Sequence, residues 1–417
     1  MAVSPSALIA PDGVLNLRIA LIVAAAAGYV ALCRLLRYAR RNKEHSRRPY
    51  QTREDFKKMT GEDAWQIVNY VQSCEFPWST RMALSFALFR TYGIPTISKL
   101  LCETQQLSKV EHAGRRYTDT NILIGSFLAY SPTSERANSA IARMNYLHSR
   151  YQKANKISND DMLYTLSLFV LEIERWMRLY EWRSLTPMEI AAFGTHWKVV
   201  GDAMGISYAV LRHSTHKDGL EFFEDLKEWA DKYEEKHMIP NKFNHQLAEE
   251  TTRILLTNVP EPLKPYGQQL VTAMMDDRLR SAMLYDQPPA IYPKIAKAVF
   301  GLRNFISKNL LPPRPRALWA SSFTDQPDPK TGRYFMTEYE NEPWYVKPTF
   351  AARNSPLAWL RWASGKPYPD GQRYKPQGYK TFEVGPENLE GLGLEECEAT
   401  RDRLLNSDRG RCPFAFS

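Results

Sequence analysis

The longest apolar stretch of the chain lies near its N-terminus. No residue between Arg18 and Arg34 is charged, and apolar neighbours extend the run to Val14–Leu36. About 23 residues at ~1.5 Å per residue are enough to cross a hydrocarbon core ~30 Å thick. A secretory signal peptide fits less well, because no basic segment precedes the run and further basic residues follow it. We therefore predict an uncleaved transmembrane anchor over residues 14–36.

Beyond residue 60, apolar side chains recur at every third or fourth position, which is the spacing of helices with one buried face. Thr186-Pro-Met-Glu189 also reads as a capping box with proline at the first helical position. No run of alternating β-branched residues predicts a strand, so we expect a mainly α-helical protein. One predicted helix follows Thr60, and another opens at Asp160 or Asp161. The other predicted helices are Ser134–Lys153, Thr186–Gly205, Met274–Tyr285 and Ile291–Leu310.

The last quarter of the chain has a different character. Residues 312–417 hold 13 of the 27 prolines, and helical spacing is weak there apart from Ser355–Trp362. Its tryptophans favour an irregular wrap packed on the helical body, with partial disorder as the alternative. The predicted organisation is an N-terminal tail (1–13), the anchor (14–36), a basic juxtamembrane linker (37–59), a helical domain (60–311) and a C-terminal extension (312–417).

Basic residues gather directly after the predicted anchor. Residues 34–48 contain seven arginines and lysines against one acid, Glu44, and thus supply +6 of the net charge of +9. Because positive charge marks the cytosolic flank of a membrane span, we expect a single-pass protein with its body in the cytosol. The same charges would attract anionic lipid. They leave little basic excess for the folded domain, so we expect no nucleic-acid partner.

The common catalytic motifs are absent from the sequence. There is no phosphate-binding GxxxxGK[ST], no GxGxxG, no HExxH and no GxSxG, and the five cysteines form no CxxC pair. Asp276-Asp277 resembles the acidic clusters that bind prenyl diphosphates, but we favour a carboxylate pair bonded to nearby arginines or to a helix N-terminus. We interpret Gly410-Arg411-Cys412 as surface tail rather than a haem-thiolate loop.

Two positions suggest ligand chemistry without establishing it. His148 falls on the apolar face of its predicted helix, beside Met144 and Tyr151. A neutral imidazole there could be an axial haem ligand, and it could equally be a core histidine bonded to a carbonyl. Arg116 and Thr120 are four residues apart and share a face if their segment is helical, where they could bind a ligand or form a surface cap.

An ordered set of short blocks carries a resemblance to a known family. The blocks are similar in order and spacing to the rubber-oxygenase (latex-clearing protein) superfamily. Two further blocks, Phe89–Ile97 and Met274–Arg280, resemble its fungal branch, the membrane-bound oxygenases of the mycophenolic acid pathway type (MpaB family). The resemblance covers roughly residues 50–415. The shared blocks are Arg116–Thr120, Arg143–Arg150, Asp160–Thr165, Leu185–Glu189 and Trp197–Gly201.

The resemblance implies a globin-like helical core that holds one non-covalent haem b. It assigns His148 as the iron ligand, with His196 as a rival. Arg116 and Thr120 match the family's Arg-x-x-Lys-Thr motif, whereas Asp119 stands in place of its lysine. Glu103 lies in the region of the family's proposed catalytic base.

The activity implied by the resemblance is that of a haem-dependent oxygenase. With O2 as co-substrate, it would cleave a C=C bond in a prenyl, farnesyl-like side chain of a secondary metabolite and give a shortened aldehyde or acid. The resemblance also implies residence in the endoplasmic reticulum membrane, and it leaves the need for an electron donor open. The alternatives are a non-catalytic haem- or lipid-binding protein and a metal-free membrane-tethering scaffold.

Overall fold

Helices make up almost all of the regular structure in the computed structural model. It describes residues 11–104, 110–257, 259–319, 321–339, 342–363 and 365–415. Over these ranges, strand-like pairing is limited to three isolated bridges in the C-terminal extension: Phe323 with Met336, Tyr334 with Tyr379, and Met336 with Val346. The predicted all-α class is therefore confirmed.

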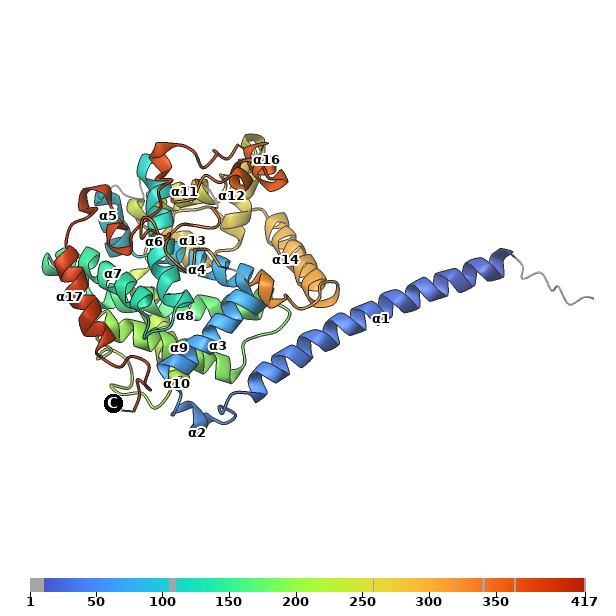
Figure 1. Cartoon of the computed structure of the whole chain (residues 1–417), viewed down its shortest axis with the longest axis horizontal. Helices are drawn as coiled ribbons and strands as arrows, with labels where there is room; N and C mark the ends of the chain where they lie inside the picture. Colours follow the sequence, from blue (N-terminus) through green and yellow to red (C-terminus); the bar gives the residue numbers. More distant parts are fainter. Residues whose placement is uncertain are drawn as a thin grey trace, which may run out of the picture.

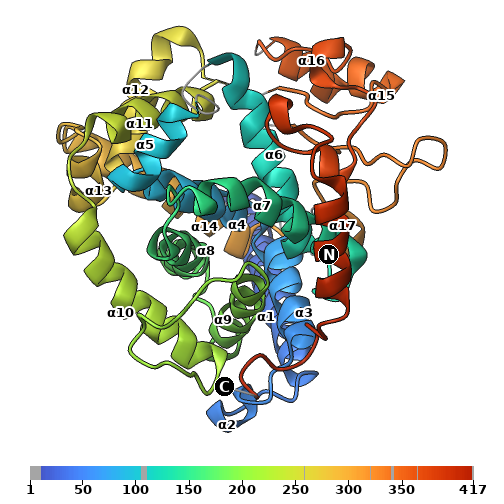
Figure 2. The same ribbon diagram turned by 90° about the vertical axis from the view of Figure 1, so that its left-hand side faces the viewer.

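The helices pack around one core and are coloured along the chain in Figures 1 and 2. α4 packs on α8, α9 on α10 and α3, and α6 on α7, while α17 covers α7 from the C-terminal extension. The helices of the body are α2 (Arg53–Phe56), α3 (Gly61–Asn69), α4 (Pro77–Thr91), α5 (Pro95–Glu103), α6 (Val110–Ala129), α7 (Glu135–Lys153), α8 (Asn159–Tyr180), α9 (Pro187–Ala203), α10 (Gly219–His237), α11 (Lys242–Leu255), α12 (Lys264–Ala273), α13 (Asp277–Ala282) and α14 (Ile291–Asn309). A π-helical turn, Tyr70–Glu75, joins α3 to α4, and the extension adds α15 (Phe350–Asn354), α16 (Pro356–Ala363) and α17 (Leu394–Leu405).

Local capping chemistry fixes most of the predicted helix starts. Thr60 and Ser134 cap α3 and α7, and Thr186 forms the expected capping box with Glu189 at the start of α9. α8 begins earlier than predicted, because the Ser158 hydroxyl accepts the Asp161 N–H at 3.0 Å. α13 is shorter than predicted because Asp276, which was expected inside the helix, is its N-cap.

Two glycines allow α9 and α10 to approach closely. A Cβ on Gly194 would lie 1.9 Å from the carbonyl oxygen of Gly219, which no side chain could tolerate without moving the backbone. A little further along α9, Trp197 is fully buried and stacks on Phe169 of α8, with ring centroids 4.8 Å apart. The centre of the molecule is thus close-packed around α8 and α9.

A single long helix, α1 (Pro11–Ser46), projects from the body (Figure 1). Its Asn16–Ser46 portion is long and apolar enough to cross a membrane, and its apolar window is almost wholly exposed. Water disfavours such a surface, whereas a bilayer accommodates it. The helix continues through Ser46, so the first part of the expected linker is helical.

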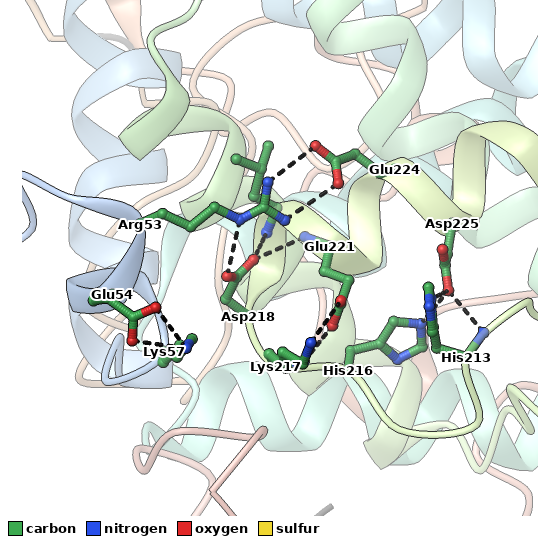
Figure 3. Close-up of polar contacts among 11 residues, drawn as sticks. Arg53, Glu54, Lys57, His213, His216, Lys217, Asp218, Glu221, Glu224 and Asp225 are labelled. Carbon is green, nitrogen blue, oxygen red and sulfur yellow. Dashed lines mark hydrogen bonds and ion pairs between the residues drawn. The ribbon is translucent and has the colours of Figure 1, made fainter.

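The rest of the juxtamembrane segment is fixed to the body through α2. Arg53 forms ion pairs with Asp218 (3.4 Å) and with Glu224 (3.2 Å) (Figure 3). Asp218 also caps α10, accepting the N–H groups of Leu220 and Glu221 at 2.9 and 2.8 Å. The connection between α1 and the body is therefore short and is held by charged contacts.

The C-terminal extension is packed on the helical body. Arg143 of α7 is fully buried and donates hydrogen bonds to three carbonyls of the extension, those of Val384 (2.8 Å), Leu389 (2.7 Å) and Leu392 (2.8 Å). Gly410-Arg411-Cys412 is not a loose tail. The carbonyl of Arg411 accepts the Gly61 N–H at 2.9 Å and so helps to cap α3.

Candidate functional site

Arg116 of α6 and His148 of α7 lie near each other where these two helices pack. The pKa of His148 is lowered to about 4, mainly by burial and further by the charge of Arg116. Both effects disfavour the imidazolium ion. His148 is therefore a neutral imidazole at physiological pH, which is the form that binds a metal.

The imidazole of His148 is not satisfied by hydrogen bonding. Its Nδ1 atom is buried and has no partner within the part of the chain that the structure describes. A structural core histidine would be bonded to a carbonyl or carboxylate, because a buried unpaired polar group is costly. A neutral, unpartnered imidazole suits a haem iron, which requires only one protein ligand.

The guanidinium of Arg116 is also without a partner. It is half-buried and forms no ion pair or hydrogen bond with any residue placed by the structure, although its charge also favours the ionised form of Asp119. Its neighbour Arg115, by contrast, forms two ion pairs, with Asp119 (3.6 Å) and Glu390 (2.8 Å). An unpaired cation beside a neutral imidazole suits a ligand that combines a metal with carboxylates, as haem does.

Thr120 and Glu103 are less directly involved. Thr120 shares the α6 face of Arg116, and its hydroxyl donates to the Arg116 carbonyl at 2.8 Å, which leaves it free only as an acceptor. Glu103, at the end of α5, is exposed and pairs with Lys156 at 3.2 Å. Across the described ranges, no contact joins Glu103 to the other three positions. The structure thus places Arg116 near His148 and Thr120 on the same helix as Arg116, and it shows no contact of Glu103 with any of them in the described chain.

Asp119, which stands in place of the family's lysine, is tied to the C-terminal extension. Its buried carboxylate accepts the hydroxyl of Tyr345 at 2.8 Å and pairs with Arg115. Burial raises its pKa to about 6, although Arg115 and Tyr345 both favour the charged form. These contacts assign Asp119 to anchoring the extension.

Replacing Asp119 by asparagine should change how stability depends on pH. The pKa of Asp119 rises from 3.8 unfolded to about 6 folded. Between these values the folded state binds more protons, so this group's contribution to stability falls as pH rises. The stability of the wild type relative to Asp119→Asn should therefore drop by roughly 2 kcal/mol from pH 4 to pH 7.

Urea unfolding of the full chain in detergent, followed by tryptophan fluorescence, measures this difference. Tyr345→Phe is the matched control, because it removes a hydrogen bond that favours the charged carboxylate. It should raise the folded-state pKa of Asp119 further and move the pH range of the stability loss upward. If the free energies of unfolding of the wild type and of Asp119→Asn change in parallel with pH, Asp119 does not titrate in this range.

Tyr92 is a site residue that sequence reasoning did not single out. It follows α4 and is buried, and its pKa is raised to about 12 by burial, against the opposing effects of the Arg116 charge and of Thr251. Its phenol is thus a neutral hydrogen-bond donor near Arg116. The one sequence feature that pointed to Tyr92 was its place in the Phe89–Ile97 block, which resembles the fungal branch. That block contains no recognisable chemical motif, so it did not mark Tyr92 as a site residue.

His196, the rival ligand, is also a buried and neutral imidazole without hydrogen-bond partners in the described chain. Both of its ring nitrogens are buried and unpartnered among the residues described, and burial together with the Arg409 charge lowers its pKa to about 3. Arg409 itself is occupied, donating to the Asn138 side chain and to the Val199 carbonyl (3.3 Å). His196 therefore lacks the free cation that accompanies His148.

Cavities lie on both sides of α6. One of about 350 Å³ is lined by Arg115, Arg116, Asp119 and residues 385–388 of the extension, so it opens directly beside the unpaired guanidinium. A second, of about 510 Å³, lies against the opposite face of α6, at Tyr117 and Asn121. A third, of about 870 Å³, lies between α7, the end of α9 and the C-terminal residues.

Comparison with known proteins defines the class. The family model described as "ER-bound oxygenase mpaB/B'/Rubber oxygenase, catalytic domain" matches residues 104–319. This range contains Arg116, Thr120, His148 and His196 and begins just after Glu103. The protein is an oxygenase.

Relatives extend the similarity over nearly the whole chain. The ER-bound oxygenase mpaB' of Penicillium brevicompactum is 42% identical over 391 residues, covering 93% of this chain and 92% of the relative. The ER-bound oxygenase mpaB of the same fungus is 38% identical, with 88% and 86% covered, and that of Penicillium roqueforti is 45% identical, with 62% and 87% covered. The chain belongs to the ER-bound oxygenase mpaB/B' family within the rubber-oxygenase superfamily.

Proposed function

We propose that this oxygenase is haem-dependent and cleaves a C=C bond in a prenyl side chain of a small molecule, giving a shortened aldehyde or acid. The observation that supports this most is the neutral, unpartnered imidazole of His148 beside the unpaired Arg116. Both belong to the matched oxygenase domain. Haem b is the cofactor whose parts, an iron and two carboxylates, match these two side chains.

In this proposal His148 would hold the iron, and Arg116 would either bind the haem carboxylates or stabilise negative charge that develops during the reaction. When bound, haem would supply the means to bind and activate O2. Tyr92 is a neutral phenol and can donate a hydrogen bond, and Thr120 can accept one. Glu103 as the catalytic base stays a prediction, since its contact is with Lys156.

The anchor accounts for the proposed substrate class. A farnesyl-like chain partitions into a bilayer at ~0.8 kcal/mol per buried CH2. An enzyme held there by residues 14–36 meets such a chain where it is concentrated. The relatives are named ER-bound, and the basic residues after the span favour a cytosolic body, so we place the catalytic domain on the cytosolic face of the endoplasmic reticulum.

Absorption spectra of the purified full chain, with and without dithionite and carbon monoxide, test the cofactor. We expect a Soret band that shifts on reduction and again with carbon monoxide. Oxygen uptake with a prenylated substrate then tests the activity, with mass spectrometry of the shortened product. A haem-free protein from haem-supplemented expression would favour the scaffold, and a Soret band without oxygen uptake would favour a non-catalytic haem- or lipid-binding protein.

Replacing Arg116 by alanine should weaken haem binding by about ten- to a hundredfold. A charge-assisted hydrogen bond contributes roughly 1.5–3 kcal/mol, and each ~1.4 kcal/mol is a factor of ten. Haem titration of the apoprotein measures this loss. Arg150→Ala, at an exposed position on α7, is the control and should bind haem as the wild type does. Equal affinity in Arg116→Ala would show that this cation does not hold the cofactor.

A further inference from the structure

α14 carries an apolar face that no part of the described chain covers. Val299, Leu302 and Phe305 are 58, 61 and 55% exposed, values far above those of side chains in a packed interface. At 100° per residue, the exposed apolar side chains fall within an arc of about 120° on one side of the helix. They are Ile291, Ile295, Val299, Leu302, Phe305 and Ile306.

The opposite face of α14 is fixed to the body, so the apolar face cannot turn inward. Phe300 packs on Tyr180, with ring centroids 4.4 Å apart. Arg303 pairs with Glu181 at 2.9 Å and lies over the ring of Trp78 at 4.1 Å. Asn304 donates to the Glu181 carbonyl at 3.1 Å. The outward orientation of the apolar face is therefore built into the fold.

The end of α14 meets α1 at the level where the apolar span ends. Tyr29 donates to the Leu310 carbonyl at 2.9 Å, Arg34 to the Asn309 side chain at 2.6 Å, and Arg37 to the Leu311 carbonyl at 2.8 Å. Arg34 ends the uncharged run near the end of the predicted span, and Arg37 is the first residue after the span. The end of α14 therefore contacts α1 at the depth of the lipid headgroups. α14 lies on the side of the body from which α1 projects (Figure 1).

The charges of α14 complement those of a lipid surface. The helix contains Lys294, Lys297 and Lys308 but no acidic residue. At the same 100° per residue, these lysines lie to one side of the apolar face, where their long stems can reach headgroups while the apolar side chains enter the acyl region. A basic helix with exposed apolar residues is typical of one lying in the plane of a membrane interface.

We infer that α14 lies in the leaflet next to the catalytic body, as a second membrane contact beside the α1 span. The occupant of its apolar face is lipid rather than protein, because the end of α14 meets α1 near the end of the apolar span. α16 (Pro356–Ala363) lies towards the same side of the body in Figure 1. α15 and α16 expose large apolar side chains: Phe350, Trp359, Leu360 and Trp362. Two contacts would hold the body at a fixed tilt against the membrane.

Spin labelling of the full chain in anionic-lipid nanodiscs tests this inference. The native Cys33, Cys74, Cys102 and Cys397 are buried, so a Cys412→Ser background leaves the introduced thiol as the accessible one. A label at Val299→Cys should be severalfold more accessible to oxygen than to a water-soluble nickel chelate. A label at Glu395→Cys on α17, on the far side of the body in Figure 1, should show the reverse preference.

Two results would overturn the inference. Equal reagent preferences at 299 and 395 would mean that α14 faces water. Exclusion of both reagents at 299, together with dipolar coupling between labels, would mean that a second copy covers this face. These readouts do not involve haem or a prenyl substrate, so they are independent of the proposed catalytic function.

Discussion

Replacing His148 by alanine is expected to abolish the Soret band and the oxygenase activity while the protein stays folded. The imidazole is neutral and its Nδ1 has no partner within the described chain, so its removal breaks no hydrogen bond there. If it is the ligand, nothing else in the proposed site replaces it. Haem affinity should fall at least about a hundredfold, and oxygen uptake should fall to background.

Three variants make this experiment decisive. His196→Ala removes the rival imidazole and should keep its Soret band. His148→Gly leaves a space in which added imidazole can serve as ligand, and so should regain the band when imidazole is supplied. Far-UV circular dichroism checks the helical fold in each case. Haem retained in His148→Ala but lost in His196→Ala would transfer the ligand role to His196.

Replacing Arg143 by methionine is expected to destabilise the protein by about 3–5 kcal/mol. The fully buried guanidinium donates to the carbonyls of Val384, Leu389 and Leu392. Methionine fills much of the same volume but donates nothing, so three carbonyls of the C-terminal extension lose a charged donor. Loss of one partner from a buried charged network carries a cost of this size.

Denaturant unfolding and limited proteolysis both measure the effect of Arg143→Met. Cleavage should begin within residues 384–392, because this segment is held to α7 through Arg143. Arg150→Met, at an exposed position on the same helix, is the matched control and should behave as the wild type. A loss below ~1 kcal/mol with unchanged cleavage would mean that other contacts, such as Arg115 with Glu390, hold the extension.

Helix starts were predictable where the signal is local. Thr60, Ser134 and Thr186 cap the helices that follow them, because a hydroxyl can reach an N–H three residues later whatever the surroundings. The start of α8 was less well predicted, since Ser158 and the two following aspartates can all act as caps. The end of α1 was also missed, because arginine and lysine are good helix formers and a change of polarity does not end a helix.

The sequence by itself determined the all-helical class, the apolar span with its basic flank, the family, and the candidates Arg116, Thr120 and His148. These depend on local periodicity, on composition and on the order of short blocks. It could not show that Arg115 is paired with carboxylates while Arg116 forms no ion pair within the described residues, because adjacent helical residues point about 100° apart and only packing decides which one meets a carboxylate.

Only the tertiary structure decided that His148 lacks a partner at Nδ1, that Asp119 anchors the extension through Tyr345, and that Glu103 pairs with Lys156. It also decided that the apolar face of α14 points outward beside α1. In each case the deciding contact joins segments far apart in the chain, whose meeting depends on how every helix packs rather than on any local pattern.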